Sequence, residues 1–181
     1  MYKRQEQLHA DTRQIEIQPL IESAKGIAAV RDLLRCPGVQ RVALGEVDLC
    51  ADLNLADANW LDPIRLELVI RSREADREPP VSTVHTRLDD EEALRNSTLR
   101  FRSMGFVGRS AIHPRQIPVI NDAFTPTDDE IRAALKLVTA IEESSARGNA
   151  AIALDGALVD RAHERTARRT LQLAGVTKGV S

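Results

Sequence analysis

Short apolar runs alternate with segments of helical spacing along the first two thirds of the chain. Four of the runs have the length of β-strands, at positions 15–21, 39–44, 81–85 and 106–107. Three segments between them carry helix signals, at positions 24–35, 62–76 and 89–104. Strands that alternate with helices in this way form βαβ units, so the pattern predicts an α/β fold around a parallel sheet.

Polar residues mark where these helices begin. Ser23 precedes the first helix and is a typical N-cap. Asp62 and Pro63 open the second, with the aspartate predicted as the cap and the proline in the first turn. The acidic run at 89–92 opens the third, where the helix dipole favours negative charge. The segment between Leu44 and Asp62 is predicted to be a loop.

The pattern changes near position 125, and the last part of the chain is predicted to form a separate arm. Thr127 and Glu130 have the spacing of a capping box, and a helical apolar stripe follows up to Gly148. An Asp-Gly turn then indicates a β-hairpin at 152–159, before a last helix at 160–174. The chain is therefore predicted to have two parts, 1–124 and 125–181.

Composition excludes several classes of function. The chain has 181 residues and a net charge of −2, so it lacks the basic character of a nucleic-acid-binding protein. Aromatic residues make up only 3%, too few for a base-stacking surface. Cys36 and Cys50 are too few for a disulfide framework and too far apart for a CxxC motif. No apolar segment suits a signal sequence or a membrane span, so the protein is expected to be cytoplasmic, with no membrane partner.

Two carboxylates follow neighbouring predicted strands. Glu22 comes directly after the first strand, and Asp48 shortly after the second. Side chains at the carboxyl ends of neighbouring parallel strands converge, and two carboxylates there repel unless a cation lies between them. Mg²⁺ suits such a pair, because it takes oxygen ligands and keeps waters that a substrate displaces. Alternatively, each carboxylate merely caps the next helix. Glu46 is a weaker candidate for a third metal ligand, and the alternative is that it is an exposed acid in a loop.

The segment 105–117, with the sequence GFVGRSAIHPRQI, has the features of a loop that holds an anion. Gly105 and Gly108 allow a tight turn and a close approach to a ligand. Arg109 offers a fork of donors for a phosphate or a carboxylate. The alternative is a glycine-rich turn with a surface arginine. His113 is expected to be a buried packing residue rather than a ligand.

The last predicted helix begins at an aspartate and carries a row of arginines. Asp160 follows the hairpin and is expected to be the N-cap of this helix. A solvated face or an interface is the expected role of the arginines. They are Arg161, Arg165, Arg168 and Arg169.

Three of these segments occur together, in this order, in one known family. They are PLIESAKG at 19–26, GEVDLCADL at 45–53, and GFVGR with IHPRQI within 105–117. Together they resemble the aldolase/citrate lyase family, which contains citrate lyase beta subunits and the malyl-CoA and citramalyl-CoA lyases. The resemblance covers most of the chain.

The resemblance implies a TIM (β/α)8 barrel that binds Mg²⁺ and cleaves or forms a carbon–carbon bond. The substrate would be a CoA thioester of a hydroxy acid, such as citryl-, malyl- or citramalyl-CoA. Carried over to this chain, the resemblance implies Glu22 and Asp48 as metal ligands, and Glu22, Gly108 and Arg109 in substrate binding. It also implies Asp160 as a catalytic acid or base that reaches into a neighbouring subunit, and therefore a homo-oligomer.

Family members are longer than this chain, which is expected to begin just before strand five. It would then supply strands five to eight of a partial barrel, followed by a C-terminal helical arm. Four strands cannot close an eight-stranded barrel. The expected function is a Mg²⁺-dependent lyase that acts on a CoA thioester or a small keto acid. Two alternatives stay open: a catalytically inactive half-barrel that binds a partner, and a pyruvate-type class II aldolase.

Overall fold

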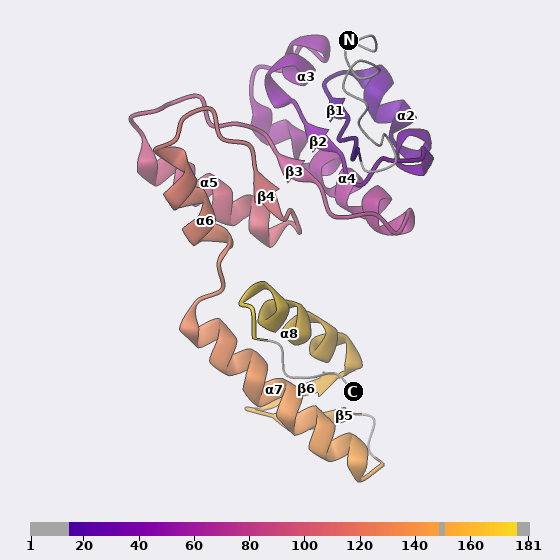
Figure 1. Cartoon of the computed structure of the whole chain (residues 1–181), viewed down its shortest axis with the longest axis vertical. Helices are drawn as coiled ribbons and strands as arrows, with labels where there is room; N and C mark the ends of the chain where they lie inside the picture. The colour runs from indigo at the N-terminus through magenta and orange to yellow at the C-terminus, as the bar shows by residue number, and fades with distance from the viewer. Residues whose placement is uncertain (1–14, 149–150, 177–181) are drawn as a thin grey trace. The chain divides into compact units, whose positions relative to one another are not determined.

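The computed structural model describes residues 15–148 and 151–176 of the chain. The chain divides into two compact units, Met1–Phe124 and Thr125–Ser181. We call them the N-terminal unit and the C-terminal unit, and Figure 1 labels their elements. No helix within the described residues is long and apolar enough to cross a membrane.

Short parallel strands form the sheet of the N-terminal unit, which confirms the predicted α/β fold. Their order in the sheet follows the sequence: β1 (Leu20–Ile21), β2 (Ala43–Leu44), β3 (Val81–Ser82) and β4 (Gly108–Arg109). The pairing extends beyond β1, because the Ile17 N–H donates to the Gly38 carbonyl and the Ala43 N–H to the Pro19 carbonyl. Pro19 thus takes part as an acceptor, although it has no N–H of its own.

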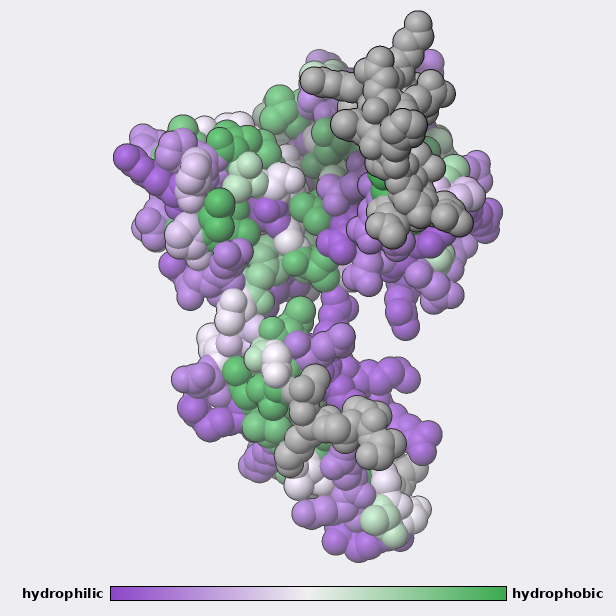
Figure 2. All heavy atoms as spheres, viewed as in Figure 1, coloured by the Kyte–Doolittle hydropathy of each residue, from purple (hydrophilic) through white to green (hydrophobic). Residues whose placement is uncertain are grey.

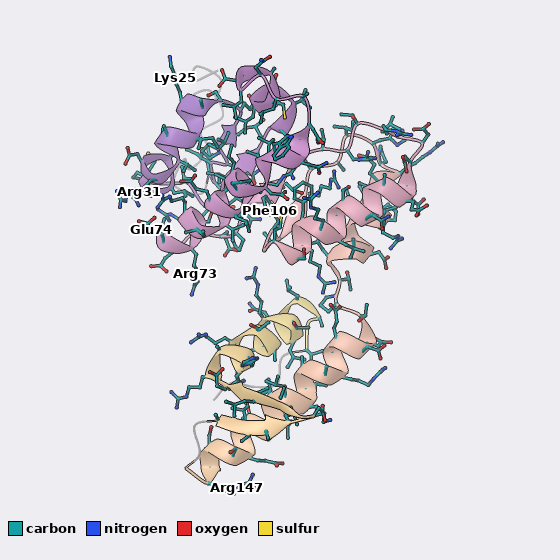
Figure 3. The ribbon with its side chains drawn as sticks, turned by 180° about the vertical axis from the view of Figure 1, so that it is seen from behind. Lys25, Arg31, Arg73, Glu74, Phe106 and Arg147 are labelled. Carbon is teal, nitrogen blue, oxygen red and sulfur yellow. The ribbon has the colours of Figure 1, made fainter. Side chains whose placement is uncertain are left out.

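Helices follow every strand of this unit. They are α2 (Ala24–Arg35), α3 (Glu46–Asp52), the 3-10 helix η2 (Ala58–Leu61), α4 (Asp62–Glu74), α5 (Glu91–Ser103) and α6 (Gln116–Phe124). Ser23 caps α2 as predicted and accepts from the Gly26 N–H. Helix α2 packs against α4, where Arg31 and Glu74 form a surface ion pair (Figure 3), and α5 packs against α6. The largest apolar core lies around β1, β2, α2, α3 and α4.

Two segments predicted as loops contain helices. The chain after β2 turns directly into α3, whose first turn carries Glu46 and Asp48. The helix dipole favours acids at this end. Helix α3 has seven residues, too few for an apolar period to reveal it. Helix α6 likewise begins within the predicted anion loop, at Gln116.

Asp62 does not cap α4, contrary to the prediction. It is the first residue of the helix, and the cap position is held by Leu61, which makes no side-chain hydrogen bond there. The Asp62 carboxylate instead accepts hydrogen bonds from the side chains of Arg65 and Arg100. Pro63 does lie in the first turn, as predicted.

Strand β4 lies two residues later than the predicted strand at 106–107. Gly105 has φ of +99° and ends α5, and the N–H of Phe106 returns to the carbonyl of Phe101. A glycine with positive φ commonly ends a helix in this way. The Phe106 ring, labelled in Figure 3, packs edge-on against the Phe101 ring, with centroids 5.3 Å apart. The two glycines of the motif thus have separate roles: Gly105 ends a helix, and Gly108 lies in the sheet.

Residues 125–148 and 151–176 of the C-terminal unit form two helices and a hairpin. They are α7 (Asp128–Ala146), β5 (Ala151–Leu154), β6 (Ala157–Asp160) and α8 (Arg161–Leu173). The predicted capping box of Thr127 and Glu130 is confirmed, and the hairpin turns at Asp155 and Gly156, both with positive φ. Helices α7 and α8 pack through Ala134, Val138, Ala167 and Leu171.

Candidate functional site

Glu22 lies at the carboxyl end of β1 and reaches the corresponding end of β2. Its side chain passes over Gly45, where a Cβ atom would lie 2.5 Å from Glu22 Cγ and 2.8 Å from Glu22 Oε1. The φ of Gly45 is −97°, so its backbone conformation does not require glycine. Gly45 is needed for space, because any larger residue would displace the Glu22 carboxylate.

Asp48 lies three residues after Gly45, in the first turn of α3, and its side chain is exposed. Within residues 15–148 and 151–176, neither the Glu22 nor the Asp48 carboxylate has a hydrogen bond or ion pair. The two predicted carboxylates therefore follow neighbouring strands and have no partner in the part of the chain described.

Glu46 has a role that the sequence did not suggest. Its carboxylate forms a two-fold ion pair with Arg65, at 2.7 Å from Arg65 Nε to Oε1 and 2.6 Å from Nη2 to Oε2. Both side chains are buried, with exposed fractions of 6% for Arg65 and 7% for Glu46. Burial opposes the charge of Arg65, but hydrogen bonds to Glu46 and Asp62 outweigh it and raise the Arg65 pKa above its ordinary value. Glu46 is therefore neither an exposed loop acid nor a free ligand for a metal.

Asp52 makes a second link between the two strand ends. Its Oδ2 accepts a hydrogen bond of 2.7 Å from the N–H of Ala24, the first residue of α2. Together with the contact of Glu22 and Gly45, this bond holds α3 against the turn after β1. Sequence reasoning missed Asp52. Had α3 been recognised as a helix, Asp52 would have appeared on the same face as Asp48, one turn later.

Arg109 connects β4 to α5. Its Nε donates to the Thr83 carbonyl at 3.0 Å, and its Nη1 donates to Ser97 Oγ at 2.7 Å and Thr98 Oγ1 at 2.9 Å. Its guanidinium also lies over the Phe101 ring, 5.3 Å from the centroid. Burial lowers the Arg109 pKa to about 10, so the side chain stays charged at neutral pH.

Arg109 forms no ion pair within the described residues, and several of its donors serve the protein itself. Gly108 lies next to it in the sheet, where its carbonyl accepts from Ser82 Oγ. Substrate binding by Gly108 and Arg109 stays a prediction.

His113 was expected to be buried, but the buried side chain in this segment is that of Gln116. His113 is partly exposed, and its Nδ1 accepts from the Arg115 N–H at 3.2 Å. Gln116 is only 3% exposed. Its Nε2 donates to the His85 carbonyl at 2.7 Å, and its Oε1 accepts from the Ile112 N–H at 2.9 Å. Gln116 thus joins the loops that follow β3 and β4.

Asp160 caps α8, as predicted. Its Oδ1 accepts from the Ala162 N–H at 2.9 Å and lies 2.8 Å from His163 Nδ1. The hydrogen bond with His163, followed by those from the backbone, lowers the Asp160 pKa. The carboxylate is therefore ionised at neutral pH and exposed to solvent. Its catalytic role stays a prediction.

Comparison with known sequences identifies the family. The family model described as HpcH/HpaI aldolase/citrate lyase matches residues 2–114. The chain belongs to this family. It is 29% identical over 186 residues to the L-malyl-CoA/beta-methylmalyl-CoA lyase of Rhodobacter capsulatus, which covers 92% of this chain and 58% of that protein. It is 40% identical over 92 residues to citrate lyase subunit beta of Leuconostoc mesenteroides subsp. cremoris, which covers 51% of this chain and 30% of that protein.

A solved structure has the same fold. The protein CitE from Mycobacterium tuberculosis, in complex with magnesium, acetoacetate and coenzyme A, matches with a TM-score of 0.76 and 23% identity. The match covers 88% of this chain and 61% of that one. This chain therefore spans less than two thirds of the length of these relatives.

Proposed function

We propose that this chain provides the metal site and the C-terminal arm of a Mg²⁺-dependent carbon–carbon lyase. Its substrate would be a CoA thioester of a hydroxy acid, of the malyl, citramalyl or citryl type. The observation that carries the proposal is the pair of carboxylates, Glu22 and Asp48, that follow neighbouring strands without partners of their own. Membership of the family supports the type of reaction, and the named relatives support the type of substrate.

The donor set fits magnesium. Mg²⁺ is commonly held by one or two carboxylates and keeps several waters for a substrate to displace. The described residues contain no cluster of three or more His, Cys, Asp or Glu side chains that would enclose an ion. Glu22 and Asp48 remain as two oxygen ligands, because Glu46 is bound to Arg65. When bound there, Mg²⁺ would act as a Lewis acid toward a carboxylate and a neighbouring oxygen of the substrate.

The residues of the chain have separate tasks in this proposal. Glu22 and Asp48 would hold Mg²⁺ at the hydroxy-acid end of the substrate. Gly108 and Arg109, in the strand next to β3, contribute to substrate binding at the same edge of the sheet. Asp160, supplied by a second copy of the chain, exchanges a proton with the carbon next to the thioester. In the cleavage direction protonated Asp160 would donate this proton to the enolate carbon. In the condensation direction its carboxylate, which is ionised at neutral pH, would accept the proton back.

The four parallel strands would correspond to strands five to eight of a partial TIM barrel. Within the described residues, β1 and β4 each pair with a single named strand, which leaves one side of each for further pairing. The same observation favours a second candidate function, a catalytically inactive half-barrel that binds a partner. Turnover by the purified chain separates the two candidates.

Cleavage of malyl-CoA and citramalyl-CoA by the full chain tests the proposal, with and without Mg²⁺. Calorimetry with Mg²⁺ and oxaloacetate measures binding independently of turnover. Glu22→Gln and Asp48→Asn are expected to abolish both signals. Asp32→Asn, an exposed acid on α2, is the control and should change neither. Binding that is unchanged in both site variants would exclude the metal site, and binding without turnover would support the inactive half-barrel.

A further inference from the structure

An open groove of about 560 Å³ lies along the C-terminal unit, between α7 and α8. This volume is within the range of small-molecule sites. Its lining consists of Glu142, Ser145, Arg161, Glu164, Arg165 and Arg168. Every one of these side chains carries a polar or charged group, so the groove suits a polar or charged ligand.

The charges of the groove are unevenly paired. Arg168 Nη2 lies 2.8 Å from Glu142 Oε1 and 2.7 Å from Glu164 Oε1. Hydrogen bonds to these two acids, with Glu164 contributing more, outweigh burial and raise the Arg168 pKa above its ordinary value. Glu142 and Glu164, the two acids of the groove, therefore both form ion pairs with Arg168. Arg161 and Arg165 form no ion pair within the described residues, so two positive charges remain without a partner.

Arg161 and Arg165 are four residues apart on one helix, so they are neighbours on its surface. Like charges at this spacing destabilise a helix, and a bound anion would remove the repulsion. On the neighbouring face of α8, Ala167 and Leu171 pack against α7 and keep the arginines at the groove. On the face seen in Figure 2, hydrophilic residues cover much of this unit and hydrophobic residues form a smaller patch.

We propose that this groove is a binding site for a diphosphate group. Each guanidinium presents a planar fork of donors that matches phosphate oxygens. Two forks on successive turns of α8 bind the two phosphates of one diphosphate, and the Ser145 hydroxyl on α7 supplies a further donor. A monocarboxylate would neutralise only one of the two charges. Glu22 and Asp48 belong to the other unit and do not line this groove.

Calorimetry of the full chain with inorganic pyrophosphate tests this site. EDTA is present throughout, so the result does not depend on the proposed magnesium site. The double variant Arg161→Gln/Arg165→Gln is expected to weaken pyrophosphate binding by roughly tenfold or more, since it removes charge-assisted hydrogen bonds. The variant Arg165→Lys keeps the charge but loses the fork, and should lie between the wild type and the double variant.

A matched control separates a defined site from general attraction by positive charge. Arg132→Gln/Lys136→Gln removes the same net charge from the same unit. Both residues lie on α7, at least six residues before Glu142, and neither lines the groove. This control should bind pyrophosphate within about twofold of the wild type, because distant charges are screened by salt. No binding by the wild type would overturn the proposal. An equal loss in the two double variants would overturn it as well.

Discussion

The Glu46–Arg65 pair places two opposite charges inside the N-terminal unit, with exposed fractions of 7% and 6%. Replacing one partner leaves the other as a buried charge with fewer ligands, and such changes cost about 3–5 kcal/mol. We expect Glu46→Gln to lower the free energy of unfolding by an amount in this range, with the lower end favoured because Asp62 still binds Arg65. Urea unfolding followed by circular dichroism measures the loss.

A surface pair on α4 is the control for this prediction. Glu67 accepts from Arg71 one turn later, at 3.2 Å from Nη2, and both side chains are partly exposed. Exposed pairs contribute little, because water and salt screen them. Glu67→Gln should therefore have a much smaller effect than Glu46→Gln. Equal effects of the two substitutions would contradict the importance of the buried pair.

Gly45 allows a sharper test of the metal site. In Gly45→Ala the new Cβ would lie 2.5 Å from Glu22 Cγ, so the Glu22 side chain must move while the backbone φ remains acceptable. We expect affinity for Mn²⁺, used as a paramagnetic substitute for Mg²⁺, to fall by roughly tenfold or more, the size typical of a disturbed ligand position. Electron paramagnetic resonance measures the free Mn²⁺.

Gly26→Ala is the matched control for this substitution. A Cβ at Gly26 meets its nearest neighbours at 3.4 Å, in ordinary contact, and alanine favours the helix in which Gly26 lies. Its Mn²⁺ affinity should equal that of the wild type. Equal affinities of the wild type and Gly45→Ala would show that Glu22 does not hold the metal.

The difference between local and distant signals explains which site residues were predictable. Glu22 and Asp48 were found because each follows an apolar run in the sequence. The partners of Glu46 and Ala24 were missed, because Arg65 is 19 residues from Glu46 and Asp52 is 28 residues from Ala24. A local sequence pattern does not indicate contacts between residues that are far apart in the chain and meet only on folding.

At the scale of elements, Asp160 makes the start of α8 sensitive to pH. The folded protein lowers the Asp160 pKa, through His163 first and backbone N–H groups next, below the value of about 3.9 in an unfolded chain. Its contribution to stability is therefore complete above about pH 4, and is lost as the pH falls through the folded pKa. We expect the difference in melting temperature between the wild type and Asp160→Asn to shrink in this range. Thermal unfolding from pH 7 to pH 2 measures it, and a constant difference would contradict the assignment.

Capping residues identified the long helices, whereas the short elements were harder to predict. Ser23 and Thr127 marked the first residues of α2 and α7 correctly, because an N-cap acts on backbone groups only two or three residues away. Asp62 is not a cap because η2 runs directly into α4, so Asp62 already has helical backbone angles and its carboxylate binds Arg65 and Arg100. Strand β4 was misplaced because Gly105 was assigned to a ligand loop, and its role in ending α5 was overlooked.

At the scale of the whole molecule, the sequence predicted a parallel α/β fold and the family, and both are confirmed. The ordered alternation of strands and helices was sufficient for the fold. The family required three motifs in the correct order, since each alone is short. Whether the active site combines residues of two copies depends on assembly, which a pattern along one chain does not encode.

Mixing two inactive variants tests such a shared site. Glu22→Gln leaves Asp160 intact, and Asp160→Asn leaves Glu22 and Asp48 intact. If Asp160 acts in the site of a second copy, a mixed oligomer contains a complete site and regains malyl-CoA cleavage. A mixture of Glu22→Gln with Asp48→Asn is the matched control. Both of these changes remove a ligand from the same carboxylate pair. Because one chain must supply both carboxylates of a site, this mixture should stay inactive.

Light scattering and mass spectrometry of differently labelled chains establish that mixed oligomers form. Mixed oligomers without recovered activity, or equal recovery in both mixtures, would show that Asp160 does not complete the site of a neighbour.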